Sequence, residues 1–95
     1  MPTWERTRRF DRDWERLSAA DRARFRRAVG SFVADLRSVQ VRPGLRVKRV
    51  EGTEAVFEMT WAPDGRATFE YGLAGPAGPH VIWRRVGRHE ILQTP

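Results

Sequence analysis

The stretch from Phe57 to Tyr71 constrains the fold of this chain more than any other. Two runs of alternating apolar and polar residues, Phe-Glu-Met-Thr-Trp and Arg-Ala-Thr-Phe-Glu-Tyr, flank the tetrapeptide Ala-Pro-Asp-Gly. Alternation with period two is typical of strands that bury one face, and Pro-Asp-Gly favours a type I turn. The pattern predicts a three-residue hairpin with a left-handed Gly65, in which Met59 pairs with Phe69.

In this register the apolar side chains of both strands share one face, including Tyr71. The polar face receives Glu58, Thr60, Arg66, Thr68 and Glu70. Glu58 and Glu70 then face each other, so a cation such as Arg66 or Arg84 is needed between them. The polar face is therefore expected to carry a network of salt bridges.

The hairpin belongs to a predicted four-stranded meander that runs from residue 45 to residue 92. Its first strand, 45–50, places Arg46 and Lys48 on the face opposite Leu45 and Val47. Its last long strand, 81–86, ends at Gly87 and leads into a short strand or turn. Alternation would place Arg84 and Arg85 on opposite faces, and the sequence leaves open which of them joins Arg66.

Two helices are predicted before the meander. Phe10, Trp14 and Leu17 recur at the spacing of one helix face, and Ser18 is a suitable N-cap for a second helix. An apolar stripe from Phe25 to Leu36 continues that helix to about residue 38, and Gly30 within it would permit close packing. A short edge strand near residues 3–8 is a weaker alternative to irregular structure.

The chain has 95 residues and no cysteine, which excludes disulfides and thiolate metal sites. Its length predicts a single α+β domain over residues 1–95, in which two helices pack on a mainly antiparallel, twisted, four-stranded sheet. No apolar run is long enough to span a membrane, so we expect a cytoplasmic protein without a membrane partner.

The net charge of +6 favours a polyanionic partner, either a nucleic acid or an acidic protein segment. The two histidines, His80 and His89, have no metal-ligand spacing, so neither a metal nor another cofactor is expected. Cation-rich strands with one histidine suit a metal-free phosphodiester reaction, which needs proton transfer and charge stabilisation.

Several short motifs resemble one family. They are Arg46-Val-Lys48 in a basic strand, Val56-Phe-Glu-Met, Gly65-Arg66 followed by Thr-Phe-Glu-Tyr, and Val86-Gly-Arg-His-Glu-Ile-Leu near the end. Their order and spacing resemble the RelE/ParE toxin superfamily, and most of all its RelE-, YafQ- and HigB-like members. The chain departs from them in lacking a tyrosine or phenylalanine after His89, where Gln93 stands.

The resemblance implies a toxin of a bacterial type II toxin–antitoxin system. It implies a metal-independent endoribonuclease that cleaves mRNA, on the ribosome or free of it, with a cognate antitoxin as partner. The implied catalytic residues are His89, Arg66, Lys48, Glu58, Arg84 and Arg85. The implied RNA contacts are Arg46, Lys48, Arg49, Arg88 and Trp83.

In that scheme Arg66, with Arg84 or Arg85, stabilises charge on the phosphate, and His89 acts as acid or base. Lys48 or Glu58 is the complementary group. Two other functions stay open: a ParE-like toxin that inhibits gyrase without nuclease chemistry, and an inactive RNA-binding relative. The structural alternatives also stay open. Arg66 could be a cross-strand partner of a glutamate, and Trp83 a core residue.

Overall fold

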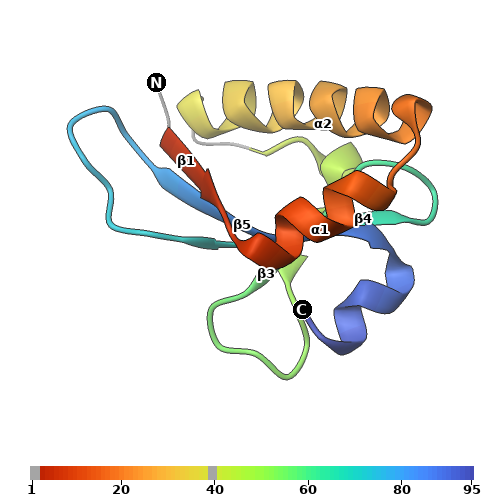
Figure 1. Ribbon diagram of the computed structural model, residues 1–95. Helices are drawn as coiled ribbons and strands as arrows, with labels where there is room; N and C mark the ends of the chain where they lie inside the picture. Colours follow the sequence, from red (N-terminus) through yellow and green to blue (C-terminus); the bar gives the residue numbers. More distant parts are fainter. Residues whose placement is uncertain (1–2, 39–40) are drawn as a thin grey trace.

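The computed structural model describes residues 3–38 and 41–95, and within them five strands form one sheet (Figure 1). The elements in chain order are β1 (Thr3–Arg6), α1 (Arg8–Arg16), α2 (Ala19–Arg37), η1 (Pro43–Leu45), β2 (Lys48–Arg49), β3 (Phe57–Thr60), β4 (Gly65–Tyr71), β5 (His80–Arg88) and η2 (His89–Gln93). The strand order is β1-β5-β4-β3-β2, with β1 parallel to β5 and the other pairs antiparallel. The α+β class is confirmed, and the edge strand near the N-terminus makes the sheet five-stranded.

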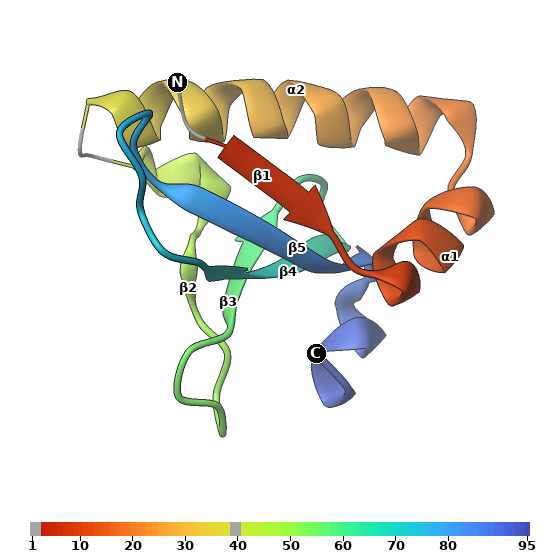
Figure 2. The ribbon, with the colours of Figure 1, turned by 60° about the vertical axis from the view of Figure 1, so that its left-hand side comes forward.

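Helix α2 lies along one face of the sheet, and η2 lies on the opposite side (Figure 2). The two faces of the sheet therefore differ in what covers them. One is packed against α2 along its length, and the short η2 lies against the other. None of the helices in the described part of the chain has the length and apolar character of a membrane span.

Both helices begin at side-chain caps. The hydroxyl of Thr7 accepts a hydrogen bond from the amide of Phe10, and that of Ser18 accepts one from the amide of Asp21. The predicted cap at Ser18 is thus confirmed. The Asp21 carboxylate accepts hydrogen bonds from Arg24 and Arg88.

The core lies between α2 and the sheet. Phe32 is fully buried, and its ring centroid lies 5.0 Å from that of Phe69 and 5.9 Å from that of Trp83. The predicted apolar stripe of α2 is therefore confirmed. Trp83 is only 5% exposed and packs among these rings, as the alternative prediction of a core residue expects. Gly30 has no atom within 4 Å of a Cβ built on it, so the close packing expected there is absent.

The hairpin register differs by two residues from the prediction. Phe57 pairs with Phe69 and Met59 pairs with Ala67, so the three-residue loop closes between Trp61 and Gly65. A shift of two residues leaves every side chain on its predicted face, and the two predicted faces are retained. Tyr71 shares the apolar face but lies at its margin, 43% exposed, where partial burial raises the pKa of its phenol.

Gly65 is not left-handed, since the only described glycines with positive φ are Gly52 and Gly78. It is required for a different reason. A Cβ on Gly65 would lie 2.6 Å from the indole ring of Trp61, which covers it. This close approach explains why a residue without a Cβ stands at position 65.

The predicted first strand of the meander is shorter than expected. Pro43–Leu45 form a 3-10 turn, and Arg46 ends it with left-handed dihedrals, φ 50° and ψ 43°. Only Lys48 and Arg49 pair with β3. A proline favours the start of a helical turn, and this turn takes Arg46 out of the strand. Arg46 and Lys48 therefore do not share a strand face as predicted.

Candidate active site

A bulge in β5 decides how its two adjacent arginines lie. Arg85 pairs with Thr68, but Trp83 pairs with Phe69, so Arg84 is an extra residue in β5. Strict alternation is interrupted there, and Trp83 and Val86 are both buried. The predicted separation of Arg84 and Arg85 onto opposite faces is wrong, since both donate hydrogen bonds to the C-terminal residues Thr94 and Pro95.

The guanidinium of Arg85 is mainly bound to a carboxylate of the protein itself. Its guanidinium donates two hydrogen bonds, of 2.9 and 2.8 Å, to the buried carboxylate of Asp13 in α1. The same carboxylate accepts a hydrogen bond from the backbone amide of Val86. The hydrogen bonds to Asp13 raise the pKa of Arg85. Arg85 thus connects α1 to β5 and is only 17% exposed.

The predicted salt-bridge network exists as separate pairs. Arg84 donates a 2.6 Å hydrogen bond to Glu70, and both side chains are about one-third exposed. Glu58 pairs with Thr68 and Glu70 pairs with Ile82, so the expected opposition of the two glutamates is wrong. The two-residue change of register separates these like charges.

Arg66 and Glu58 lie together on the polar face. The Arg66 Nε atom is 3.9 Å from a carboxylate oxygen of Glu58, and both side chains are mostly buried. Arg66 Nη1 also donates to backbone carbonyls of the hairpin, including that of Gly65 at 3.0 Å. Lys48 pairs with Glu58 across β2 and β3, and is exposed. The hairpin therefore holds one cation in place beside a carboxylate, with a lysine on the adjacent strand.

His89 lies at the same end of the sheet as Arg66. Arg66 pairs with Gly87 of β5, and His89 follows two residues later as the first residue of η2. The close contact between Gly87 and Ile91, 3.0 Å from a Cβ built on the glycine, lets η2 turn over the polar face. The imidazole of His89 is exposed, and it makes no hydrogen bond or ion pair within residues 3–38 and 41–95.

The remaining proposed RNA contacts do not form one surface. Arg88 binds Asp21 at 2.6 Å and lies over the ring of Trp61, on the side of the sheet that α2 covers. Arg49 pairs with Phe57, which belongs to the apolar face. Lys48 is thus the one member of this set on the face of Arg66. The structure places Arg46 beside a different surface, a groove shared with α2.

His80 is a structural residue. Its Nδ1 atom lies 2.7 Å from the hydroxyl of Thr3, and its Nε2 atom lies 2.8 Å from the carboxylate of Glu5. These contacts join β1 to β5 far from Arg66. Of the two histidines, only His89 is placed where it could take part in chemistry with the cations of the polar face.

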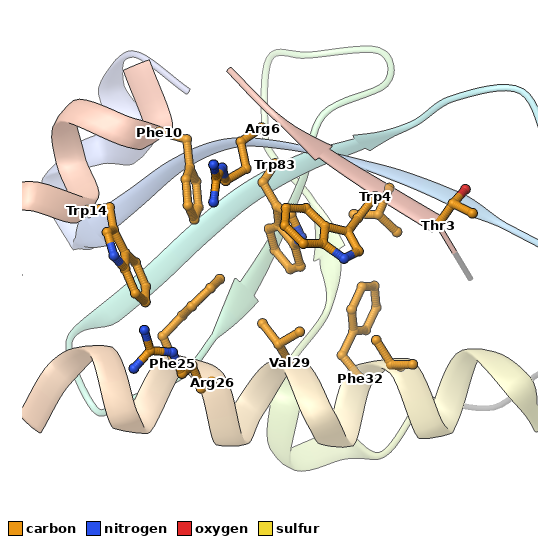
Figure 3. Close-up of a pocket in the computed structure, with 12 residues that line it drawn as sticks. Thr3, Trp4, Arg6, Phe10, Trp14, Phe25, Arg26, Val29, Phe32 and Trp83 are labelled. Carbon is orange, nitrogen blue, oxygen red and sulfur yellow. The ribbon is translucent and has the colours of Figure 1, made fainter. Parts of the chain in front are cut away.

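An apolar hollow of about 320 Å³ lies on the helix side of the sheet, between β1, α1 and α2 (Figure 3). Phe25, Val29 and Phe32 of α2 form one side of it, and Trp4 of β1 is 59% exposed at its margin. Arg6 and Arg26 are the charged residues among those that line it. This hollow is separate from the polar face and contains neither Arg66 nor His89.

Within the described part of the chain, no group of three or more His, Cys, Asp or Glu side chains could hold a metal ion. The groups gathered around the hairpin end of the polar face are instead a carboxylate, guanidinium groups, an ammonium and an imidazole. This set can neutralise an anion and transfer protons, which are the two operations that phosphodiester cleavage by an internal hydroxyl requires.

No protein-family model and no curated protein matches the sequence. Solved structures match over nearly the whole chain. A chain of the E. coli DinJ–YafQ complex has a TM-score of 0.68 and 11% identity, covering 97% of this chain and 98% of that one. A chain of the RelB–RelE antitoxin–toxin complex from Methanococcus jannaschii has a TM-score of 0.60 and 15% identity, covering 94% of each chain.

A metal-bound toxin from Helicobacter pylori is a third solved structure with a similar fold. Its TM-score is 0.63 at 18% identity, covering 95% of this chain and 97% of that one. At these identities the comparisons establish the fold. The combination of two helices with a mainly antiparallel sheet is shared with these toxins.

Proposed function

We propose that this chain, which has the fold of RelE- and YafQ-type toxins, is the toxin of a toxin–antitoxin pair and acts as a metal-independent endoribonuclease on mRNA in the cytoplasm. The fold supports the proposal that the chain is a toxin, and the net charge of +6 supports a polyanionic substrate. The DinJ–YafQ and RelB–RelE complexes support a cognate antitoxin as partner.

One observation carries the nuclease proposal. Arg66 of the hairpin pairs with Gly87, near the end of β5, and His89 begins η2 two residues after Gly87. A fixed cation for the phosphate and an accessible group for proton transfer therefore occupy the same end of the polar face. Glu58, 3.9 Å from Arg66, supplies a carboxylate at that position.

The reaction would proceed by attack of a ribose 2′-hydroxyl on the adjacent phosphorus. The new bond joins O2′ to phosphorus, the bond from phosphorus to O5′ breaks, and a cyclic phosphate and a 5′-hydroxyl result. Glu58 or Lys48 takes the proton of the 2′-hydroxyl, and His89 gives a proton to O5′ as it leaves. Arg66 and Arg84 stabilise the additional negative charge on the phosphoryl oxygens.

Arg85 has a positioning role in this proposal. Its fork of N–H donors is directed at Asp13 and Thr94, so it holds α1 and the C-terminal segment against β5. Arg84, its neighbour in the bulge, keeps a more exposed guanidinium, bound to Glu70 and to the carbonyl of Pro95. An incoming phosphate can compete for Arg84 more readily than for Arg85.

A second candidate function is inhibition by binding alone. It is favoured because three arginines of the site already form ion pairs within the chain. These are Arg66 with Glu58, Arg84 with Glu70 and Arg85 with Asp13. A toxin of this kind would bind its target with its surface and would not cleave RNA. Experiment separates the two functions directly.

The test is cleavage of a labelled mRNA by the purified protein, with and without ribosomes. We expect cleavage products with a cyclic phosphate, and no cleavage at a position where a single 2′-deoxynucleotide replaces the cleaved residue. His89→Gln should lose cleavage, while Glu90→Gln, its exposed neighbour, should retain it. Growth arrest by the parent protein with intact mRNA in cells and on ribosomes would reject the nuclease and favour inhibition by binding.

A further inference from the structure

A groove of about 600 Å³ lies between α2, η1 and the β3–β4 hairpin. Its lining contains four arginines and no acidic residue. The arginines are Arg24, Arg27, Arg46 and Arg66. Four guanidinium groups around one open groove produce a strongly positive potential there, which a bound anion would neutralise.

The four cations of this groove differ in how far carboxylates of the chain already compensate them. Arg27 and Arg46 make no ion pair within the described residues. Arg66 is bound to neutral carbonyls and lies at 3.9 Å from Glu58. Arg24 shares the carboxylate of Asp21 with Arg88. These contacts compensate only part of the positive charge that lines the groove.

The backbone conformation at the end of η1 fixes the position of Arg46 at the groove. Arg46 adopts a left-handed conformation, which residues other than glycine rarely adopt, and its amide caps the 3-10 turn through the carbonyl of Pro43. The turn is itself anchored to α2, because Asp35 accepts hydrogen bonds from both the amide and the guanidinium of Arg42. Arg46 thus lines the groove at a conformational cost.

The groove also borders an unsatisfied donor. Trp61 lines it and is 7% exposed, and its indole N–H is buried without a hydrogen-bond acceptor among the described residues. A buried donor without an acceptor is uncommon and unfavourable. An acceptor oxygen of a bound ligand that reached this N–H would remove that cost.

We propose that this groove binds the phosphodiester backbone of RNA at phosphates other than the one that is cleaved. The proposal rests on the proposed function in taking RNA as the ligand. Arg66 belongs both to the groove and to the polar face, so a strand held near Arg66 can continue between α2 and η1. That continuity favours RNA over an acidic protein segment, and the planar guanidinium fork suits phosphate.

The test measures affinity for a 2′-O-methyl RNA of about 12 nucleotides, a length within the usual range of single-strand sites. This RNA cannot undergo 2′-hydroxyl attack, so binding is separated from cleavage. The variant is the double substitution Arg27→Gln with Arg46→Gln. The control is Arg12→Gln with Arg37→Gln, two exposed arginines outside the groove, so that both proteins lose the same charge.

For single-stranded nucleic acid each phosphate contact contributes about 0.7 to the slope of log affinity against log salt. We expect the groove variant to bind more weakly than the control, with a slope reduced by about 1.4 relative to the parent. Equal affinity and slope for the groove variant and its control would overturn the proposal, as would a parent that does not bind this RNA.

A parallel titration with an oligoglutamate peptide distinguishes the other macromolecular ligand. If the groove variant lost peptide affinity and kept RNA affinity, the groove would be a protein-binding surface and the proposal would be wrong. The result is also independent of catalysis. Loss of RNA affinity in a protein that never cleaves RNA supports the groove and rejects the nuclease, whereas cleavage with unchanged binding does the reverse.

Discussion

Arg85 of β5 and Asp13 of α1 form a bidentate ion pair that is almost removed from solvent. Their side chains are 17% and 8% exposed, and the N–H···O distances are 2.9 and 2.8 Å. The carboxylate also accepts the amide of Val86, so one side chain satisfies three donors of β5. This pair joins residues that are 72 positions apart.

Asp13→Ala should therefore be strongly destabilising. It leaves a buried guanidinium unpaired, which typically costs about 3–5 kcal/mol of unfolding free energy. Urea denaturation measures this, with Glu15→Ala, an exposed change in the same helix, expected within about 0.5 kcal/mol of the parent. A small effect of Asp13→Ala, equal to that of the control, would show that the pair does not form.

Gly65→Ala should destabilise the hairpin through contact with Trp61. The added methyl would lie 2.6 Å from the indole ring, and the ring is buried against the core. Overpacking of this kind costs about 1–3 kcal/mol. Thermal or urea unfolding gives the value, with Gly44→Ala as the control because nothing lies within 4 Å of its Cβ. Stability equal to that of the control would place the ring of Trp61 elsewhere.

Gly30→Ala should increase the free energy of unfolding, in contrast to Gly65→Ala. Gly30 lies inside α2, and a Cβ there meets no atom within 4 Å. Alanine reduces the backbone entropy of the unfolded chain, so a gain of about 0.5–1 kcal/mol is expected. Denaturation midpoints of the two proteins provide the test, and a loss of stability would indicate a partner packed closely on this part of the helix.

The anchor between α2 and η1 should make stability depend on acid pH. Hydrogen bonds from the side chain and backbone of Arg42 lower the pKa of Asp35 from 3.8 to about 2. Because the folded-state pKa is depressed, this contribution is complete above about pH 3.8 and disappears as the pH falls through about 2.

Asp35→Asn should consequently be less stable than the parent at neutral pH and should lose less stability between about pH 4 and pH 2. Unfolding free energies across this range show the difference between the two curves. Asp64→Asn, on the exposed hairpin loop, should follow the parent curve. Parallel curves for Asp35→Asn and the parent would mean that Arg42 does not stabilise the ionised carboxylate.

Arg66→Ala should reduce RNA cleavage by roughly 100-fold or more if Arg66 stabilises the reacting phosphate. Circular dichroism should show a folded protein, and Arg66→Lys should restore part of the rate because it returns the charge without the fork. Arg12→Ala, on the exposed face of α1, serves as the control. Full cleavage by a folded Arg66→Ala protein would remove Arg66 from the mechanism.

Local patterns in the sequence predicted the two helices and the two faces of the β3–β4 hairpin. The cap at Ser18, the stripe through Phe32 and the alternation around Pro63 each depend on residues that are close in the chain. Such patterns report local dihedral preferences and which side of an element is apolar, and both are preserved when partners shift. The polar face, with Arg66 and Glu58 on it, could thus be predicted before any pairing was known.

Which residues meet could be seen only once the chain was folded. The hairpin pairs in a register two residues from the predicted one, with the ring of Trp61 over Gly65. The bulge at Arg84 brings two adjacent arginines to the same C-terminal segment. The arginine groove arises where α2, η1 and the hairpin come together. Contacts between distant segments depend on packing, and packing is a property of the assembled chain that no local pattern encodes.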